Sequence, residues 1–234
     1  DKTSDVTTDV RAAFDDMIGK YSPDHPNVKI SWKIRTGKVY REITDEAKLQ
    51  DAMLIVVGTH GASGFESFWI GSNANKIVSA SICPVITIRG GINIRRPLTR
   101  IVLPIDSSDE TRQKVRFTTQ LAKLHNAEVF ILKLYTSRLK DIRHKVDLYA
   151  IQVVNYLSGQ GVKYQVDFAQ CENISATTIE YAKKIEANLI AVMTSQEGSS
   201  NIFLGPYAHQ IVNQSPIPVL SVHPSQALAV GQAF

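Results

Sequence analysis

Apolar residues follow two different spacings along the second half of the chain. Short runs of continuous or alternating apolar residues predict β-strands, and stretches with an apolar residue at every third or fourth position predict helices. The predicted strands are Arg100–Ile105, Glu128–Leu134, Val162–Phe168, Asn188–Val192 and Pro218–Val222. The predicted helices are one that follows Ser107-Ser108, then Asp141–Leu157, Ser175–Glu186 and Pro206–Asn213. This alternation indicates an α/β fold with a doubly wound parallel sheet covered by helices on both faces.

The first part of the chain repeats part of this pattern. The strand near residue 55 returns 135 residues later, where Ala187, Leu189, Ile190 and Val192 match Ala52, Leu54, Ile55 and Val57. After a one-residue deletion, an offset of 134 relates Gly71 to Gly205 and Pro84-Val85 to Pro218-Val219. An offset of this length is the size of a domain, so it indicates a duplication rather than a solenoid repeat. We call the two halves copy one and copy two.

Copy one has fewer elements than copy two. Its pattern predicts helices over Val6–Ile18, Ile43–Leu49 and Ser72–Ser79, and strands over Val28–Ile34, Met53–Val57 and Pro84–Ile88. These match only the last three strands of copy two, so we expect copy one to lack a β-α-β unit of about 35–40 residues. Because a sheet without its central strand leaves backbone groups unpaired, we favour a cleaved or truncated domain over a true half-domain. The predicted domains are residues 1–92 and 100–224, with a linker at 93–99 and a tail at 225–234.

Copy one carries a glycine-rich motif directly after its Met53–Val57 strand. The motif is Gly58-Thr59-His60-Gly61, then nine residues, then Gly71-Ser72 at the start of a helix. Ligands of open α/β sheets bind at the carboxyl ends of the strands, and glycines let backbone N–H groups approach an anion. The first N–H groups of a helix also favour phosphate. The motif therefore predicts a phosphate site, with a loop kept for turn geometry as the alternative.

Two common nucleotide signatures are absent from the sequence. The motif is not G-x-G-x-x-G, and GxxxxGK[ST] does not occur. The spacing Gly58-x2-Gly61-x9-Gly71-Ser72 instead resembles the nucleotide motif of the universal stress proteins. The segment RIVLPIDSSDET, residues 100–111, is similar to the first strand and turn of that family. The resemblance covers both copies and indicates a tandem universal stress protein.

The resemblance implies both a fold and a ligand. Family members share a flavodoxin-like, Rossmann-like sheet with the strand order 3-2-1-4-5, and they pair through their last strands. Here those strands are Pro84–Ile88 and Pro218–Val222, so the two copies should form an internal pseudo-dimer. Many members bind ATP, and Mg²⁺ can accompany the phosphates.

The family's binding residues carry over differently to the two copies. In copy one, Gly58, Gly61, Gly71 and Ser72 match the phosphate and ribose contacts, and Thr59 and Asn73 lie beside them. The residues that contact the base would fall in the absent segment. In copy two, Asp106 matches the nucleoside-contacting Asp, Leu134 falls near the adenine contact, and Gly205 is retained. Because Met193, Gln196 and Pro206 replace the first glycine, the second glycine and the serine, we expect no tight nucleotide in copy two. Asp106 then has an alternative role in an Asx turn.

Composition excludes several other classes of protein. The chain has 234 residues, of which 44% are hydrophobic and 21% charged, as in globular proteins. Its net charge of +4 is unclustered, so we expect neither nucleic-acid nor membrane binding. Cys83 and Cys171 lie far apart in the sequence and match no zinc-site or disulfide spacing. We therefore expect two buried free thiols and a protein located in the reducing cytoplasm.

Three functional hypotheses follow. The first is an ATP-binding regulatory or stress-response protein with its site in copy one. The second is a scaffold or interaction protein of the same fold that binds no nucleotide. The third and weakest is a nucleotide-consuming enzyme, for which a loop such as SGGxDS is missing from the sequence. We name no catalytic residue and no metal ligand, and expect at most slow ATP hydrolysis. A further homodimer stays open.

Overall fold

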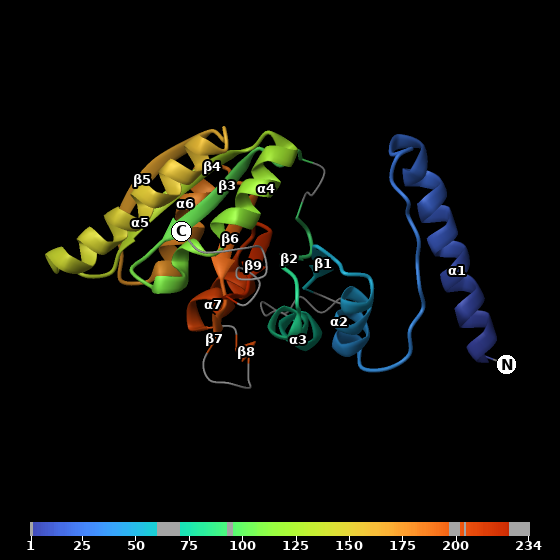
Figure 1. The fold of residues 1–234 in the computed structure, drawn as a ribbon. Coiled ribbons are helices and arrows are strands. Elements are labelled where there is room, and N and C mark those ends of the chain that lie inside the picture. Colours follow the sequence, from blue (N-terminus) through green and yellow to red (C-terminus); the bar gives the residue numbers. More distant parts are fainter. Residues whose placement is uncertain (1, 60–70, 93–95, 197–201, 204, 225–234) are drawn as a thin grey trace. The chain divides into compact units, whose positions relative to one another are not determined.

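The chain divides into two units, Asp1–Gly37 and Lys38–Phe234 (Figure 1). The computed structural model describes residues 2–59, 71–92, 96–196, 202–203 and 205–224. Within that part of the chain, no helix is long and apolar enough to cross a membrane. The predicted domain limits at residues 92, 99 and 224 stay predictions.

The first unit is a helix followed by an extended segment. Helix α1 spans Lys2–Tyr21, and a short 3-10 helix, η1, spans Ser22–Asp24. The segment after them is fastened to α1 through Trp32. The ring of Trp32 stacks on Phe14 at 5.9 Å between centroids, and its Nε1 donates to Asp15 Oδ1 at 2.8 Å.

The predicted strand at Val28–Ile34 is wrong, because this segment forms no β-strand. A strand exists through hydrogen bonds to a neighbouring strand. The counterpart in copy two, β5 at Tyr164–Gln170, pairs with β4 at Glu128–Tyr135. Among the described residues, no strand pairs with residues 28–34.

The second unit contains the remaining elements, most of them where the sequence predicts them. Copy one contributes α2 (Val39–Leu49), β1 (Ile55–Gly58), α3 (Ser72–Ala80) and β2 (Val85–Ile88). Copy two contributes β3 (Arg100–Ile105), η2 (Asp109–Arg112), α4 (Val115–His125), β4, α5 (Lys140–Gly159), β5, α6 (Ile174–Lys184), β6 (Leu189–Met193), α7 (Pro206–Gln214) and β9 (Val219–Val222). A short hairpin of β7 (Ser195–Gln196) and β8 (Ile202–Phe203) was not expected. The helix predicted after Ser107-Ser108 is in fact η2 followed by α4.

A single sheet runs through both copies, in the order β1-β2-β9-β6-β3-β4-β5. Copy one supplies only β1 and β2 to it, so the strands of the two copies form one continuous sheet in the described residues. Strands β2 and β9 pair antiparallel, with Val85 opposite Ser221 and Thr87 opposite Val219. All other neighbours in this sheet are parallel. The last strands of the two copies thus meet, as the family resemblance implies.

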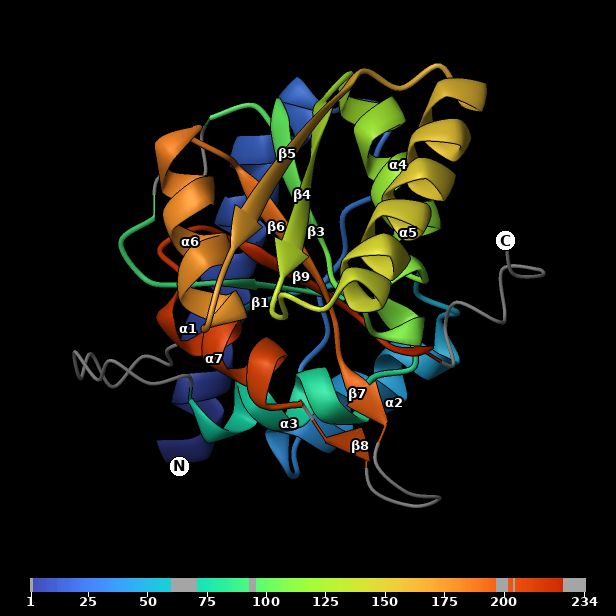
Figure 2. The ribbon, with the colours of Figure 1, turned by 90° about the vertical axis from the view of Figure 1, so that its left-hand side faces the viewer.

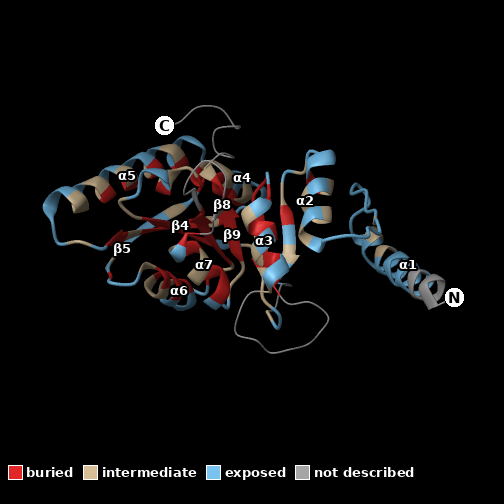
Figure 3. Ribbon diagram, turned by 90° about the horizontal axis from the view of Figure 1, so that it is seen from below, coloured by how far each residue is buried: buried red, intermediate tan, exposed pale blue. Residues whose placement is uncertain are grey.

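Helices cover both faces of this sheet. Figure 2 shows α4 and α5 on one face of the copy-two strands and α6 and α7 on the other. Each face has its own apolar core. Val115, Val146 and Leu157 lie in one, and Ile77, Ile179 and Ile211 lie in the other. Buried residues are concentrated along the strands between these layers (Figure 3). Parallel strands buried on both faces explain the nearly continuous apolar runs in the sequence.

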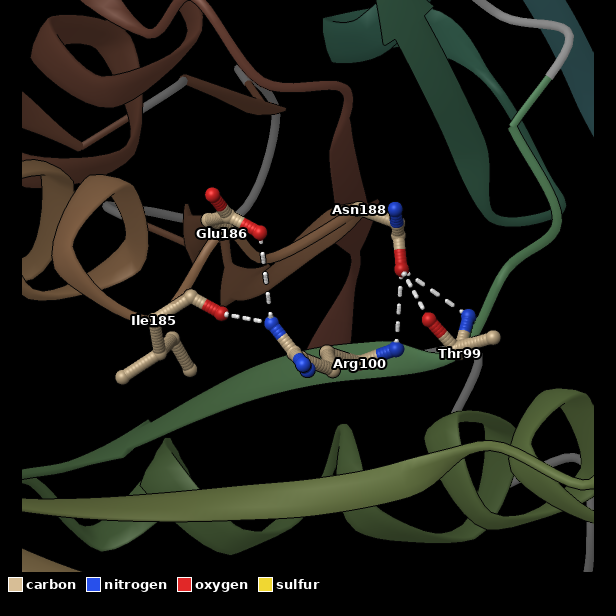
Figure 4. A network of polar contacts seen from close by, with 5 residues as sticks. All are labelled: Thr99, Arg100, Ile185, Glu186 and Asn188. Atoms are coloured by element: carbon tan, nitrogen blue, oxygen red, sulfur yellow. Dashed lines mark hydrogen bonds and ion pairs between the residues drawn. The ribbon is translucent and has the colours of Figure 1, made fainter.

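Asn188 joins the beginnings of β3 and β6 (Figure 4). Its Oδ1 accepts hydrogen bonds from Thr99 N, Thr99 Oγ1 and Arg100 N, each at 2.9 Å. The guanidinium of Arg100 donates to Ile185 O at 2.7 Å and lies 3.7 Å from a Glu186 carboxylate oxygen. Because that ion pair is exposed, Asn188 carries more of the stability of this junction.

Replacing Asn188 by alanine should lower the free energy of unfolding by about 1–2 kcal/mol, because three donors lose a shared acceptor that water replaces only in part. Urea denaturation measures the effect. Asn188→Asp is the matched control, since it keeps the acceptor oxygen and should lose less stability. Equal losses in the two variants would contradict the role given to the acceptor.

His223 links the two copies across the β2–β9 junction. Its imidazole is buried and lies within hydrogen-bonding distance of Thr194 Oγ1 and of Val78 O in helix α3 of copy one. A carbonyl oxygen only accepts, so Nε2 donates to Val78 and Nδ1 accepts from Thr194, as a neutral ring allows. Burial lowers the pKa of His223, although the bond to Val78 opposes this.

The variant His223→Phe should lose about 2 kcal/mol of stability at pH 7, because Val78 O and the Thr194 hydroxyl lose a buried partner. The folded-state pKa of His223 is depressed, so the unfolded chain binds its proton first as the pH falls. This histidine therefore removes stability from the wild type as the pH falls below its ordinary pKa of 6.5. Urea denaturation from pH 5 to 8 should show the difference between the proteins shrinking at low pH. A difference that grows at low pH would contradict the neutral bridge.

Candidate functional site

The end of β1 and the beginning of α3 form the described part of the glycine-rich motif. Thr59, directly after Gly58, donates its backbone N–H to Ile88 O on β2 at 2.9 Å. Thr59 O accepts the N–H of Gly71 at 2.8 Å. The first bond continues the pairing of β1 with β2, and the second joins the end of β1 to the start of α3. Gly61 lies among residues 60–70, outside the described part of the chain.

Gly71 has no room for a side chain. An ideal Cβ at this position would lie 2.8 Å from Thr59 O, closer than Cβ atoms come to oxygen. The backbone of Gly71 has a φ of −57°, which any residue adopts, so it is the close approach that requires glycine. Gly71 is thus required for packing against Thr59. The sequence analysis considered Gly71 only as a ligand-binding or turn residue.

Helix α3 presents a polar first turn above a buried apolar face. Ala74, Ile77 and Val78 are buried, while Ser72 and Asn73 are exposed. The first N–H groups of a helix have no intrahelical acceptor, and the helix dipole adds positive potential there. Gly58, Thr59, Gly71, Ser72 and Asn73 are therefore brought to one end of β1, in a setting that favours a phosphate group.

Copy two preserves this framework but changes the side chains. Thr194 donates its N–H to Val222 O at 3.0 Å, as Thr59 does to Ile88 in copy one. Gly205 precedes α7, as Gly71 precedes α3. Met193, however, is buried where copy one has Gly58. The Met193 side chain therefore occupies space at the strand end, whereas Gly58 in copy one has no side chain there.

Tyr207 is a second side chain that makes copy two differ from copy one at the matching site. It stands at the position of Asn73 in copy one. Burial and the nearby charge of Asp106 both raise the pKa of its hydroxyl far above the usual range. An aromatic side chain therefore lies beside the carboxyl end of β3, where an open α/β sheet would receive its ligand.

Asp106 adopts the structural role that was left open as an alternative. Its Oδ1 accepts the N–H of Ser108 at 2.9 Å and also the Ser108 hydroxyl. Its own N–H donates to Thr111 Oγ1 at 3.2 Å. This pattern is an Asx turn, which leads from β3 into η2. The other two copy-two candidates are Leu134, whose side chain is 1% exposed in the core, and Gly205, which is buried at the start of α7.

Lys114 is a buried lysine that the sequence analysis missed. It is 2% exposed, and its Nζ donates to Thr111 O at 2.5 Å. Burial lowers the pKa of Lys114 to about 8, and the carboxylate of Asp106 opposes this shift. Residues 111, 114, 115, 118 and 122 are all buried. The helical spacing of 111, 114, 118 and 122, three or four residues apart, is the signal by which the sequence could have indicated that Lys114 is buried.

Neither cysteine contributes chemistry to the described site. Cys83 and Cys171 are free and buried, as the sequence predicts. Burial raises the pKa of the Cys171 thiol, so the reactive thiolate is disfavoured. The described residues contain no cluster of three His, Cys, Asp or Glu side chains that could hold a metal ion.

Comparisons with known sequences point to one family. Its model, described as the universal stress protein family, matches residues 5–89 and 97–223. A universal stress protein of Bacillus subtilis is 40% identical over 53 residues, which cover 23% of this chain and 36% of that protein. Another, from Methanocaldococcus jannaschii, is 36% identical over 62 residues, which cover 26% of this chain and 36% of that protein. The chain spans about a third of the length of these relatives.

A solved structure shares the fold. The universal stress protein from Archaeoglobus fulgidus DSM 4304 has a TM-score of 0.71 at 16% identity, over 94% of this chain and 78% of that one. At this identity the similarity concerns the fold alone. The family model matches two successive segments that together contain most of both copies. This chain therefore belongs to the universal stress protein family, with the family's sequence present twice in tandem.

Proposed function

We propose that this chain is an ATP-binding regulatory protein of the stress response, located in the cytoplasm, with its nucleotide site in copy one. The observation that carries the proposal is the meeting of Thr59 and Gly71, which sets the strand end of β1 against the polar first turn of α3. Glycines and free helix N–H groups together favour phosphate. Two buried free thiols agree with a reducing compartment.

The residues of copy one would divide the work between backbone and side chains. Gly58, Thr59 and Gly61 would let the backbone approach the phosphates, and Ser72 and Asn73 would add polar groups from α3. The described part of the motif contains no carboxylate. Mg²⁺ would therefore enter with ATP and be held mainly by phosphate oxygens and water, as this ion prefers.

Copy two would stabilise the assembly rather than bind nucleotide tightly. Met193 and Tyr207 take up space beside the strand ends, and Asp106 already serves an Asx turn. The pairing of β2 with β9 supports an internal pseudo-dimer, in which each copy would have the strand order 3-2-1-4-5 when complete. ATP would act by favouring one conformation or partner surface, with slow hydrolysis or none.

Isothermal titration calorimetry with ATP, tripolyphosphate and adenosine tests this proposal. Because the described residues suit phosphate, ATP should bind with one site per chain, and adenosine should bind at least about tenfold more weakly. Tripolyphosphate should compete with ATP. Adenosine binding as tight as that of ATP would contradict a phosphate-centred site. Absence of any ATP binding would favour the scaffold hypothesis instead.

A further inference from the structure

A cavity of about 660 Å³ lies beside the junction of the two copies, in the second unit. It is bounded by the chain after β2 and by the segments that lead into β6 and β9. Its apolar walls are Ile86, Ile88, Ile92, Leu98, Leu189 and Ile217. Its volume is in the range of small-molecule sites. None of the residues proposed to bind nucleotide lines it.

The polar groups that line this cavity include two cations. Arg89 and Arg96 are among its lining residues, and each carries a guanidinium group. The sequence from 89 to 100 contains four arginines and no acidic residue. A guanidinium forms paired hydrogen bonds with the oxygens of a carboxylate or a phosphate. The positive charge of this part of the lining therefore complements an anion.

Asn188, shown in Figure 4, is a further polar residue of the same lining. Its amide oxygen is turned toward Thr99 and Arg100 by three hydrogen bonds. The amide orientation is thereby fixed, and the nitrogen points away from those partners (Figure 4). Since an amide nitrogen only donates, it suits an acceptor group, as the arginines do.

We propose that this cavity binds an amphipathic anion, with an apolar chain against the isoleucine and leucine walls and one carboxylate or phosphate group at Arg89 and Arg96. The apolar walls favour burial of the chain. A ligand with many hydroxyl groups fits less well, because most of the wall offers them no partner. The proposal is independent of ATP binding, because the two sets of residues do not overlap.

The test measures binding of octanoate, octyl phosphate and octanol to the purified chain by calorimetry, with ATP present at saturation. Both anions should bind, and octanol, which has the same chain without charge, should bind at least about tenfold more weakly. Whichever anion binds more tightly identifies the head group. Octanol binding as tight as octanoate would overturn the proposal, as would no binding of either anion with or without ATP, or anion binding seen only when ATP is left out.

Variants locate the binding. The double variant Arg89→Gln/Arg96→Gln should lower the affinity for the anions at least about tenfold and leave octanol binding unchanged. Arg138→Gln is the matched control, because Arg138 is exposed and does not line the cavity. Pro216→Trp places a large side chain at an exposed lining position and should abolish binding of all three probes. Unchanged anion affinity in the double variant, or an equal loss in the control, would overturn the assignment.

Discussion

Replacing Gly71 by alanine should weaken ATP binding roughly tenfold to a hundredfold and lower stability by about 1–3 kcal/mol. The added Cβ would lie 2.8 Å from Thr59 O, so the end of β1 and the start of α3 must move apart. That movement strains the hydrogen bond from Gly71 N to Thr59 O, which sets the spacing of the proposed phosphate site. Titration calorimetry gives the affinity, and urea denaturation gives the stability.

Two controls separate binding from folding. Gly205→Ala makes the same change at the matching position of copy two, and should leave ATP affinity unchanged even if it costs stability. Ser72→Ala removes one hydroxyl from the first turn of α3 and should weaken ATP binding only a few-fold. If Gly205→Ala reduced ATP affinity as much as Gly71→Ala, the assignment of the site to copy one would be wrong.

Lys114→Met should abolish a pH dependence of stability worth about 3 kcal/mol in the wild type. The pKa of Lys114 is lowered from 10.5 to about 8 in the folded chain. Between these two values the unfolded chain holds a proton that the folded chain has released. The contribution of Lys114 to stability therefore rises with pH from about 8 to 10.5 and is constant below that window.

Urea denaturation of both proteins at several pH values from 7 to 10.5 measures this contribution as a difference. Tyr181, Tyr207 and Cys171 have raised pKa values and remove stability as the pH rises, but they are present in both proteins. At pH 7 the methionine variant should be the more stable, because it no longer buries a charge. A difference between the proteins that does not change with pH would show that Lys114 titrates normally.

The repeat is what made most of the fold predictable. Once the matches at offsets of 135 and 134 were aligned, copy two supplied the interpretation of the shorter copy one. The pairing of the last strands also followed from the family resemblance. Strand β3 was placed at its observed limits, because buried parallel strands are continuous apolar runs.

Contacts that depend on a distant partner could not be predicted. Residues 28–34 have the alternation of a strand, yet periodicity does not tell whether a neighbouring strand exists. The bridge from His223 to Val78 spans 145 residues, and nothing local to either residue indicates it. The burial of Lys114 was not predicted, because a charged residue just before α4 breaks the apolar spacing from which buried positions are inferred.

The candidate site was predicted in composition but not in geometry. The glycine spacing indicated which residues would lie near β1 and α3. The close contact between Gly71 and Thr59 depends on how the helix packs beside the strand, which spacing alone does not specify. Met193 at the strand end could be noted from the sequence, whereas the burial of the Tyr207 hydroxyl depends on how α7 packs.

Native mass spectrometry of the purified chain with ATP tests the central claim most directly, because it counts bound nucleotides. The account predicts one nucleotide per chain, with an occupancy that falls in Gly71→Ala and is unchanged in Gly205→Ala. Two nucleotides per chain would show that copy two also binds. No nucleotide at all, or a nucleotide lost only in Gly205→Ala, would contradict the assignment of the site to copy one.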